Sequence, residues 1–78
     1  MSGGGIVVLR NRLKEYRAIL SCNQQEMGKK CGVSRQTISL IERGDYSPSV
    51  TLALTIAKIC DAKVEDIFYL EEEGNEKK

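Results

Sequence analysis

The chain has 78 residues, of which 41% are hydrophobic and 29% charged, an ordinary composition for one small globular domain. Its three cysteines form no CxxC pair and it has no histidine, so we expect no metal, no cofactor and no structural disulfide. We also expect no enzyme, because the sequence offers no set of acid, base and nucleophile to assemble.

The charge is divided unevenly along the chain. Residues 1–44 carry eight Lys/Arg against three Glu, a charge of +5, whereas residues 45–78 carry four against eight, a charge of −4. A basic half suits contact with phosphates. The same division of charge would also arise if both halves simply carried ordinary solvent-exposed charged residues with no binding role. Without an apolar run of roughly 18 residues or a signal peptide, the sequence predicts a cytoplasmic protein with no membrane partner.

The first predicted elements are a strand and a helix. Residues 1–5 have the composition of a flexible segment, and Ile6, Val7 and Val8 begin a β-branched run that can pair with a second run at 68–70 as a small two-stranded antiparallel sheet. Asn11 can cap a helix over about residues 12–20, because Leu13, Tyr16 and Leu20 follow the spacing of one buried face.

The next two helices have clear start and stop signals. Asn23 and Glu26 form a capping box that begins a helix ending at Cys31. Gly28 lowers helix propensity inside it, so we expect another backbone to approach closely there. Gly32 provides the exit from this helix, and Ser34 caps the following helix at 35–43.

The helix at 35–43 has two different faces. A helical wheel turns Ile38, Ile41 and Glu42 inward, and the opposite face presents a polar set with one leucine, namely Gln36, Leu40 and Arg43, flanked by Thr37 and Ser39, with Arg35 in the first turn. After Gly44, Pro48 disfavours a helix at Ser47 and predicts an irregular loop.

The rest of the chain predicts two more helices and a tail. Ser49 caps a fourth helix with an apolar stripe through Leu52, Ile56 and Ile59, and a last helical turn covers residues 64–67. Residues 71–78 read as a charged flexible tail. The expected fold is therefore all-α, with five helices in one domain over residues 6–70.

Two helices of about eight residues joined by a glycine-containing turn form a helix-turn-helix. Here the sequence resembles the phage repressor and Cro-type (XRE-like) regulator family between about Leu9 and Phe68. The segments that carry the resemblance are Asn-Gln-Gln-Glu-Met-Gly at 23–28, Cys-Gly-Val-Ser-Arg-Gln-Thr-Ile-Ser at 31–39, Ile-Glu-Arg-Gly at 41–44, Pro-Ser at 48–49 and Val-Glu-Asp-Ile-Phe at 64–68.

The chain looks most like the small dimeric regulators of the cytolysin-repressor type. This resemblance implies a lambda-repressor-like domain that regulates transcription as a homodimer, as a repressor, with helix 35–43 in the major groove of a palindromic double-stranded DNA operator. The termini fit a dimer because they are more apolar than a monomer requires, and the interface is expected at Ile6, Val7, Val8, Phe68, Tyr69 and Leu70.

Residue chemistry suggests which side chains read bases. Gln36 can make a bidentate contact to adenine, and Arg35 can do the same to guanine or can bind a phosphate. Ser39 can add a contact to a base edge. Leu40, where the family often has a polar reader, can only pack against thymine methyls or sugar, or else join the core.

Phosphate contacts are expected around both helices of the motif. Gln24 matches the family's phosphate-binding glutamine, and Gln25 is a weaker candidate for the same role. Ser34 matches the family's capping residue. Further candidates are Thr37, whose hydroxyl can instead complete the cap, and the residues at the end of the helix and after it, Arg43, Tyr46 and Ser47. Asp45 departs from the family pattern and should weaken that last group.

Structural roles are expected for a charged pair and for the cysteines. In the family, the residues that match Arg17 and Glu42 form a buried bridge. The cysteines stand at apolar positions and should pack in the core, with a redox role left open for Cys22. An alternative function is an antitoxin or anti-regulator adaptor that holds a protein partner, which predicts sequence-blind DNA binding. No small-molecule ligand is expected.

Overall fold

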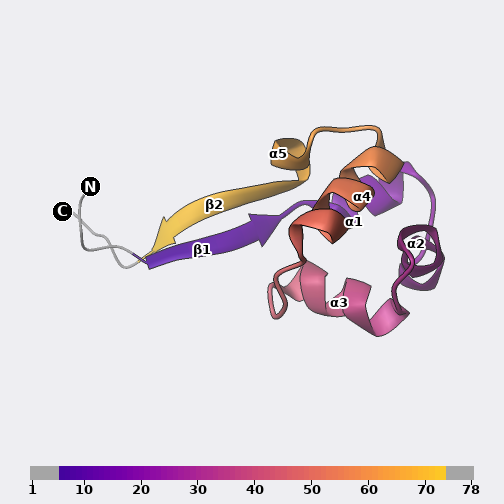
Figure 1. The fold of residues 1–78 in the computed structure, drawn as a ribbon, viewed down its shortest axis with the longest axis horizontal. Helices are drawn as coiled ribbons and strands as arrows, with labels where there is room; N and C mark the ends of the chain where they lie inside the picture. The colour runs from indigo at the N-terminus through magenta and orange to yellow at the C-terminus, as the bar shows by residue number, and fades with distance from the viewer. Residues whose placement is uncertain (1–5, 74–78) are drawn as a thin grey trace.

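The computed structural model describes residues 6–73 and contains five helices with a small two-stranded antiparallel sheet, as predicted (Figure 1). The proposed flexible segments at 1–5 and 74–78 lie outside the described residues. In chain order, the elements are β1 (Ile6–Asn11), α1 (Leu13–Ile19), α2 (Gln24–Cys31), α3 (Arg35–Arg43), α4 (Val50–Cys60), α5 (Val64–Ile67) and β2 (Phe68–Glu73).

Every helix contributes to a single core. Six large side chains are fully buried, and they come from all five helices: Leu13, Met27, Ile38, Ile41, Ile56 and Ile67. The inward positions predicted for Ile38 and Ile41 are confirmed. Because short helices cannot fold alone, this shared apolar centre is what holds the α2–α3 pair in place.

Side-chain caps define most helix starts. Asn23 and Glu26 form the predicted capping box, and Ser34 and Ser49 accept hydrogen bonds from the first turns of α3 and α4. α1 begins one residue later than predicted. The Asn11 Oδ1 accepts from the Leu13 N–H at 3.0 Å, so Asn11 still caps this helix, from outside its N-cap position.

Two glycines determine the turn between α2 and α3. A Cβ on Gly28 would lie 2.6 Å from the carbonyl oxygen of Val33, which explains the predicted close backbone approach. Gly32 has a φ of +79°, in the left-handed region that favours glycine. The turn therefore passes directly over α2, and this fixes how α3 lies against it.

β1 and β2 form an arm that projects from the helices (Figure 1). Leu9 lies opposite Leu70, and the pairing continues outward to Ile6 opposite Glu73. The prediction that a charged tail begins at residue 71 is therefore wrong for residues 71–73. These residues extend the strand because β1 offers them backbone partners and because Arg10 Nε lies 2.7 Å from Glu71 Oε1.

The cysteines pack in or against the core, as predicted. Cys22 and Cys60 are buried members of it and Cys31 is partly buried beside it, all as free thiols. Burial raises the pKa of Cys60 to about 11 and also raises the pKa of Cys31. Within residues 6–73, no helix is long and apolar enough to cross a membrane, and no group of three or more Cys, Asp or Glu side chains is placed to hold a metal ion.

Candidate nucleic-acid interface

The outer face of α3 forms one side of a polar hollow. Gln36, Ser39 and Arg43 line it together with Arg35 and, from the start of α2, Gln24. A neighbouring hollow shares Gln24 and Arg35 and adds Gln25. The fold thus gathers six of the predicted contact residues on one surface, across the first helix of the motif and the outer face of the second.

Leu40 neither lines the hollow nor belongs to the core. Its side chain is partly buried, but it does not line the hollow formed by Gln36 and Ser39, and it is not packed with the core side chains. Its carbonyl oxygen accepts the Asp45 N–H at 2.9 Å, which helps to end α3. The position leaves apolar surface available beside the polar hollow.

Two predicted phosphate ligands are engaged with each other at the start of α3. The Ser34 Oγ accepts from the Thr37 N–H at 3.1 Å, and the two hydroxyl oxygens lie 3.0 Å apart. Thr37 thus takes part in the cap, as the alternative interpretation of this residue expects. Each hydroxyl has further lone pairs, and Ser34 is exposed at a helix N-terminus, where an anion is favoured.

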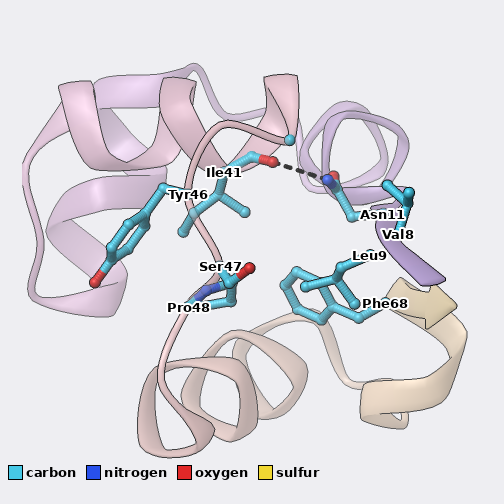
Figure 2. Close-up of a pocket in the computed structure, with 9 residues that line it drawn as sticks. Val8, Leu9, Asn11, Ile41, Tyr46, Ser47, Pro48 and Phe68 are labelled. Atoms are coloured by element: carbon cyan, nitrogen blue, oxygen red, sulfur yellow. Dashed lines mark hydrogen bonds between the residues drawn. The ribbon is translucent and has the colours of Figure 1, made fainter. Parts of the chain in front are cut away.

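The candidate residues at the end of α3 and in the loop after it lie in different surroundings. Arg43 Nε lies 3.2 Å from Asp45 Oδ2 in an exposed ion pair, so the carboxylate partly neutralises this cation as expected from the sequence. Tyr46 is exposed. Ser47 does not line the hollow of α3 but a small pocket beside Val8 and Phe68 at the base of the arm (Figure 2).

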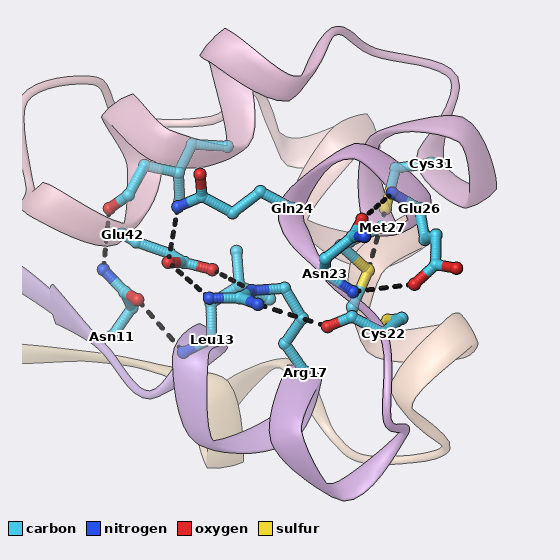
Figure 3. Close-up of polar contacts among 11 residues, drawn as sticks. Asn11, Leu13, Arg17, Cys22, Asn23, Gln24, Glu26, Met27, Cys31 and Glu42 are labelled. Atoms are coloured by element: carbon cyan, nitrogen blue, oxygen red, sulfur yellow. Dashed lines mark hydrogen bonds and ion pairs between the residues drawn. The ribbon is translucent and has the colours of Figure 1, made fainter.

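Behind the hollow, a partly buried polar network joins α1, α2 and α3 (Figure 3). The Arg17 guanidinium donates to both oxygens of Glu42, with Nε at 2.7 Å and Nη2 at 3.2 Å, and its Nη1 donates to the Cys22 carbonyl at 3.1 Å. The Glu42 side chain is only 8% exposed. The hydrogen bond to Glu42 raises the pKa of Arg17.

Gln24 belongs to this network, a contact that the sequence analysis missed. Its Nε2 donates to Glu42 Oε1 at 3.1 Å, so the amide is held in place while one N–H of the NH₂ group remains for another acceptor. Asn11 also has a contact that the sequence did not predict, because only its role as a helix cap was expected. Its Nδ2 donates to the Ile41 carbonyl at 2.8 Å as well. Both contacts join residues distant in the sequence, and no local pattern reveals them.

Known proteins resemble the chain in sequence and in fold. A model of the helix-turn-helix family matches residues 13–67. The chain is 49% identical over 66 residues to the uncharacterized HTH-type transcriptional regulator YgzD of Bacillus subtilis, which covers 85% of this chain and all of that protein. It is 51% identical over 65 residues to the uncharacterized HTH-type transcriptional regulator MJ0272 of Methanocaldococcus jannaschii, covering 83% and 98% of the two chains.

Among solved structures, the P22 c2 repressor in complex with the synthetic operator 9T superimposes with a TM-score of 0.67 at 30% sequence identity, over 69% of this chain and 82% of that one. The restriction-modification controller protein C.AhdI of Aeromonas hydrophila shares the fold, with a TM-score of 0.64 at 24% identity over 69% and 78%. The five helices of the chain are therefore arranged as in phage repressors.

Proposed function

Because the chain belongs to the Cro/C1-type helix-turn-helix family of DNA-binding transcriptional regulators, we propose that it is a repressor that binds a palindromic operator as a homodimer. The observation that carries this proposal is the exposed outer face of α3, which presents Arg35, Gln36 and Ser39 in one polar hollow. The family is one of regulators and not a class of enzymes. Occupancy of the operator would itself block transcription.

In this proposal, α3 enters the major groove and its exposed side chains read bases. Arg35 donates to the O6 and N7 of guanine, and Gln36 pairs with the N6 and N7 of adenine. Ser39 contacts a neighbouring base edge. Leu40, partly buried on the same helix, packs its apolar side chain against a thymine methyl.

The phosphates on either side of the groove are bound by the ends of the motif. Gln24 and Gln25 donate from the first turn of α2, where the free backbone N–H groups also favour an anion. Gln24 is the better placed of the two, because its bond to Glu42 holds the amide. We assign the remaining phosphate contacts to Ser34 and Thr37 at the start of α3 and to Arg43, Tyr46 and Ser47 at its end.

The second copy of the chain is proposed to dock on the arm. Ile6, Val7 and Leu70 are between 56% and 69% exposed, which is costly for large apolar side chains on a free surface. Val8 and Tyr69 would complete the interface. Phe68, predicted as a further interface residue, is only 9% exposed because it packs into the core of its own protomer, so it would support the arm from below.

Substitutions in the base-reading set test this proposal. We expect Arg35→Ala and Gln36→Ala each to cost about 1–3 kcal/mol of binding to the preferred duplex and to relax the choice of base at one position. Lys58→Ala is the control, since it removes an exposed cation from α4. Binding constants for duplexes varied one base pair at a time provide the measurement. If all three variants bound every duplex equally, the proposal would be contradicted in favour of the adaptor alternative.

A further inference from the structure

Asn11 links three elements through its two side-chain ends. It is the last residue of β1, and its Oδ1 accepts from the first N–H of α1 at 3.0 Å while its Nδ2 donates to the Ile41 carbonyl in the last turn of α3 at 2.8 Å (Figures 2 and 3). The bonds are partly buried, so water competes with them less than at the surface. One amide thus connects the arm, α1 and the DNA-facing helix.

The link lies where side-chain packing is incomplete. A pocket of about 70 Å³ separates the base of the arm from the loop after α3, with Val8 on one side and Pro48 on the other (Figure 2). The pocket is partly open to solvent, and the side chains on its opposite walls do not touch each other across it. A directional hydrogen bond beside such a space therefore carries more of the task of fixing the arm relative to α3.

We propose that Asn11 is a positioning residue that sets the orientation of α3 relative to the arm, and thereby the half-site spacing that the dimer accepts. The inference rests on the proposed function, in which the arm holds the second copy. Two copies of α3 must reach successive major grooves about 34 Å apart. Since each α3 is tied to its arm through Asn11, a change of angle there alters their separation, although Asn11 does not touch DNA.

Two variants separate this link from the cap. Asn11→Asp keeps an acceptor for the Leu13 N–H, and its charge suits a helix N-terminus, but it places a carboxylate against the Ile41 carbonyl. Asn11→Ser also keeps an acceptor and is too short to reach Ile41. Lys14→Ala, an exposed position in the first turn of α1, serves as the control.

The experiment measures binding of each protein to a single half-site and to inverted repeats whose spacing differs by one base pair. We expect the wild type and Lys14→Ala to prefer one spacing by about tenfold. This corresponds to a binding penalty of about 1.4 kcal/mol for the wrong spacing, similar to the cost of one mismatched base pair in a site. Both Asn11 variants should bind the half-site within about twofold of the wild type, yet their preference for that spacing should fall below about threefold.

Each other outcome contradicts the inference. An unchanged spacing preference would show that Asn11 does not position α3, and equal losses on half-site and full site would assign it to the fold of the motif itself. Unfolding of both variants, seen by circular dichroism, would likewise make its role structural. A wild type that prefers no inverted repeat would instead overturn the proposed function, and this inference with it.

Discussion

Glu42 lies between two donors, the Arg17 guanidinium and the Gln24 amide, and is almost fully removed from solvent. Removing both charges of an ion pair from water is costly, and the cost is offset only when the geometry is good and the remaining polar atoms are bonded. Here the guanidinium is bidentate and its third bond goes to the Cys22 carbonyl. The network therefore stabilises the relation among α1, α2 and α3, and it holds Gln24 at the proposed phosphate site.

Glu42→Ala should lower stability strongly, because it leaves the Arg17 charge without its partner. Breaking a fully buried pair costs about 3–5 kcal/mol, and since Arg17 keeps some contact with water we expect about 2 kcal/mol. This corresponds to a fall in Tm of roughly 10 °C for a domain of this size. Glu15→Ala, an exposed glutamate of α1, is the control, and thermal unfolding measures both. A shift no larger than that of the control would refute the assignment.

At the scale of elements, the motif depends on how closely the turn passes over α2. Gly28 N-terminal to the turn admits the Val33 carbonyl at a distance that no Cβ tolerates, and Gly32 reverses the chain with a positive φ. Ser34 then restarts the helix with its side-chain cap. These local devices set the angle between α2 and α3, and therefore the polar hollow that both helices line.

Gly28→Ala should be more destabilising than Gly32→Ala, for different physical reasons. The methyl group at position 28 meets backbone atoms that cannot rotate away, so the turn must shift, at a cost of about 1–3 kcal/mol. At position 32 an added Cβ would have no atom within 4 Å apart from those of its chain neighbours. The cost there is the left-handed backbone alone, about 1 kcal/mol. Denaturant unfolding would compare them. The reverse order would mean that the close approach at Gly28 relaxes easily.

Local signals explain how far the sequence could predict the elements. α2 and α3 have the predicted bounds because their caps and glycine exits lie within a few residues of each other. β2 extends beyond its predicted end because Glu71 finds its partner Arg10 on the other strand, about 60 residues away. The second bond of Asn11 and the bond of Gln24 to Glu42 also depend on tertiary contacts, which no local pattern encodes.

At the scale of the molecule, both faces of the arm carry apolar side chains. Cross-strand partners share a face of the sheet, so Leu9 and Leu70 lie together on one face, with Val7 and its partner Glu72 two residues further out. The other face holds the Arg10–Glu71 ion pair together with Ile6, Val8 and Tyr69. Leu9 packs against the core, whereas Ile6, Val7 and Leu70 are exposed. A second copy is expected to cover these exposed apolar side chains of the arm.

Leu70→Glu should weaken the dimer without unfolding the protomer. Each copy loses about 1.5–3 kcal/mol of apolar burial, and because a twofold interface loses it twice, the Kd for dimerisation should rise by more than about 100-fold. Ile19→Glu is a matched control, since Ile19 on α1 is as exposed as Leu70 but lies outside the arm. Sedimentation equilibrium gives both constants. If the two variants assembled equally, the arm would not be the interface.

The central claim is that α3 reads a specific operator as one of a symmetric pair, and selection from a pool of random duplexes at physiological salt tests it most directly. We predict enrichment of an inverted repeat whose half-sites lie about one helical turn apart. Its half-sites should contain a guanine that the Arg35→Ala variant no longer prefers and an adenine that the Gln36→Ala variant no longer prefers. Enrichment of no sequence, with binding that vanishes as salt is raised, would leave only nonspecific electrostatic attraction and would contradict the claim.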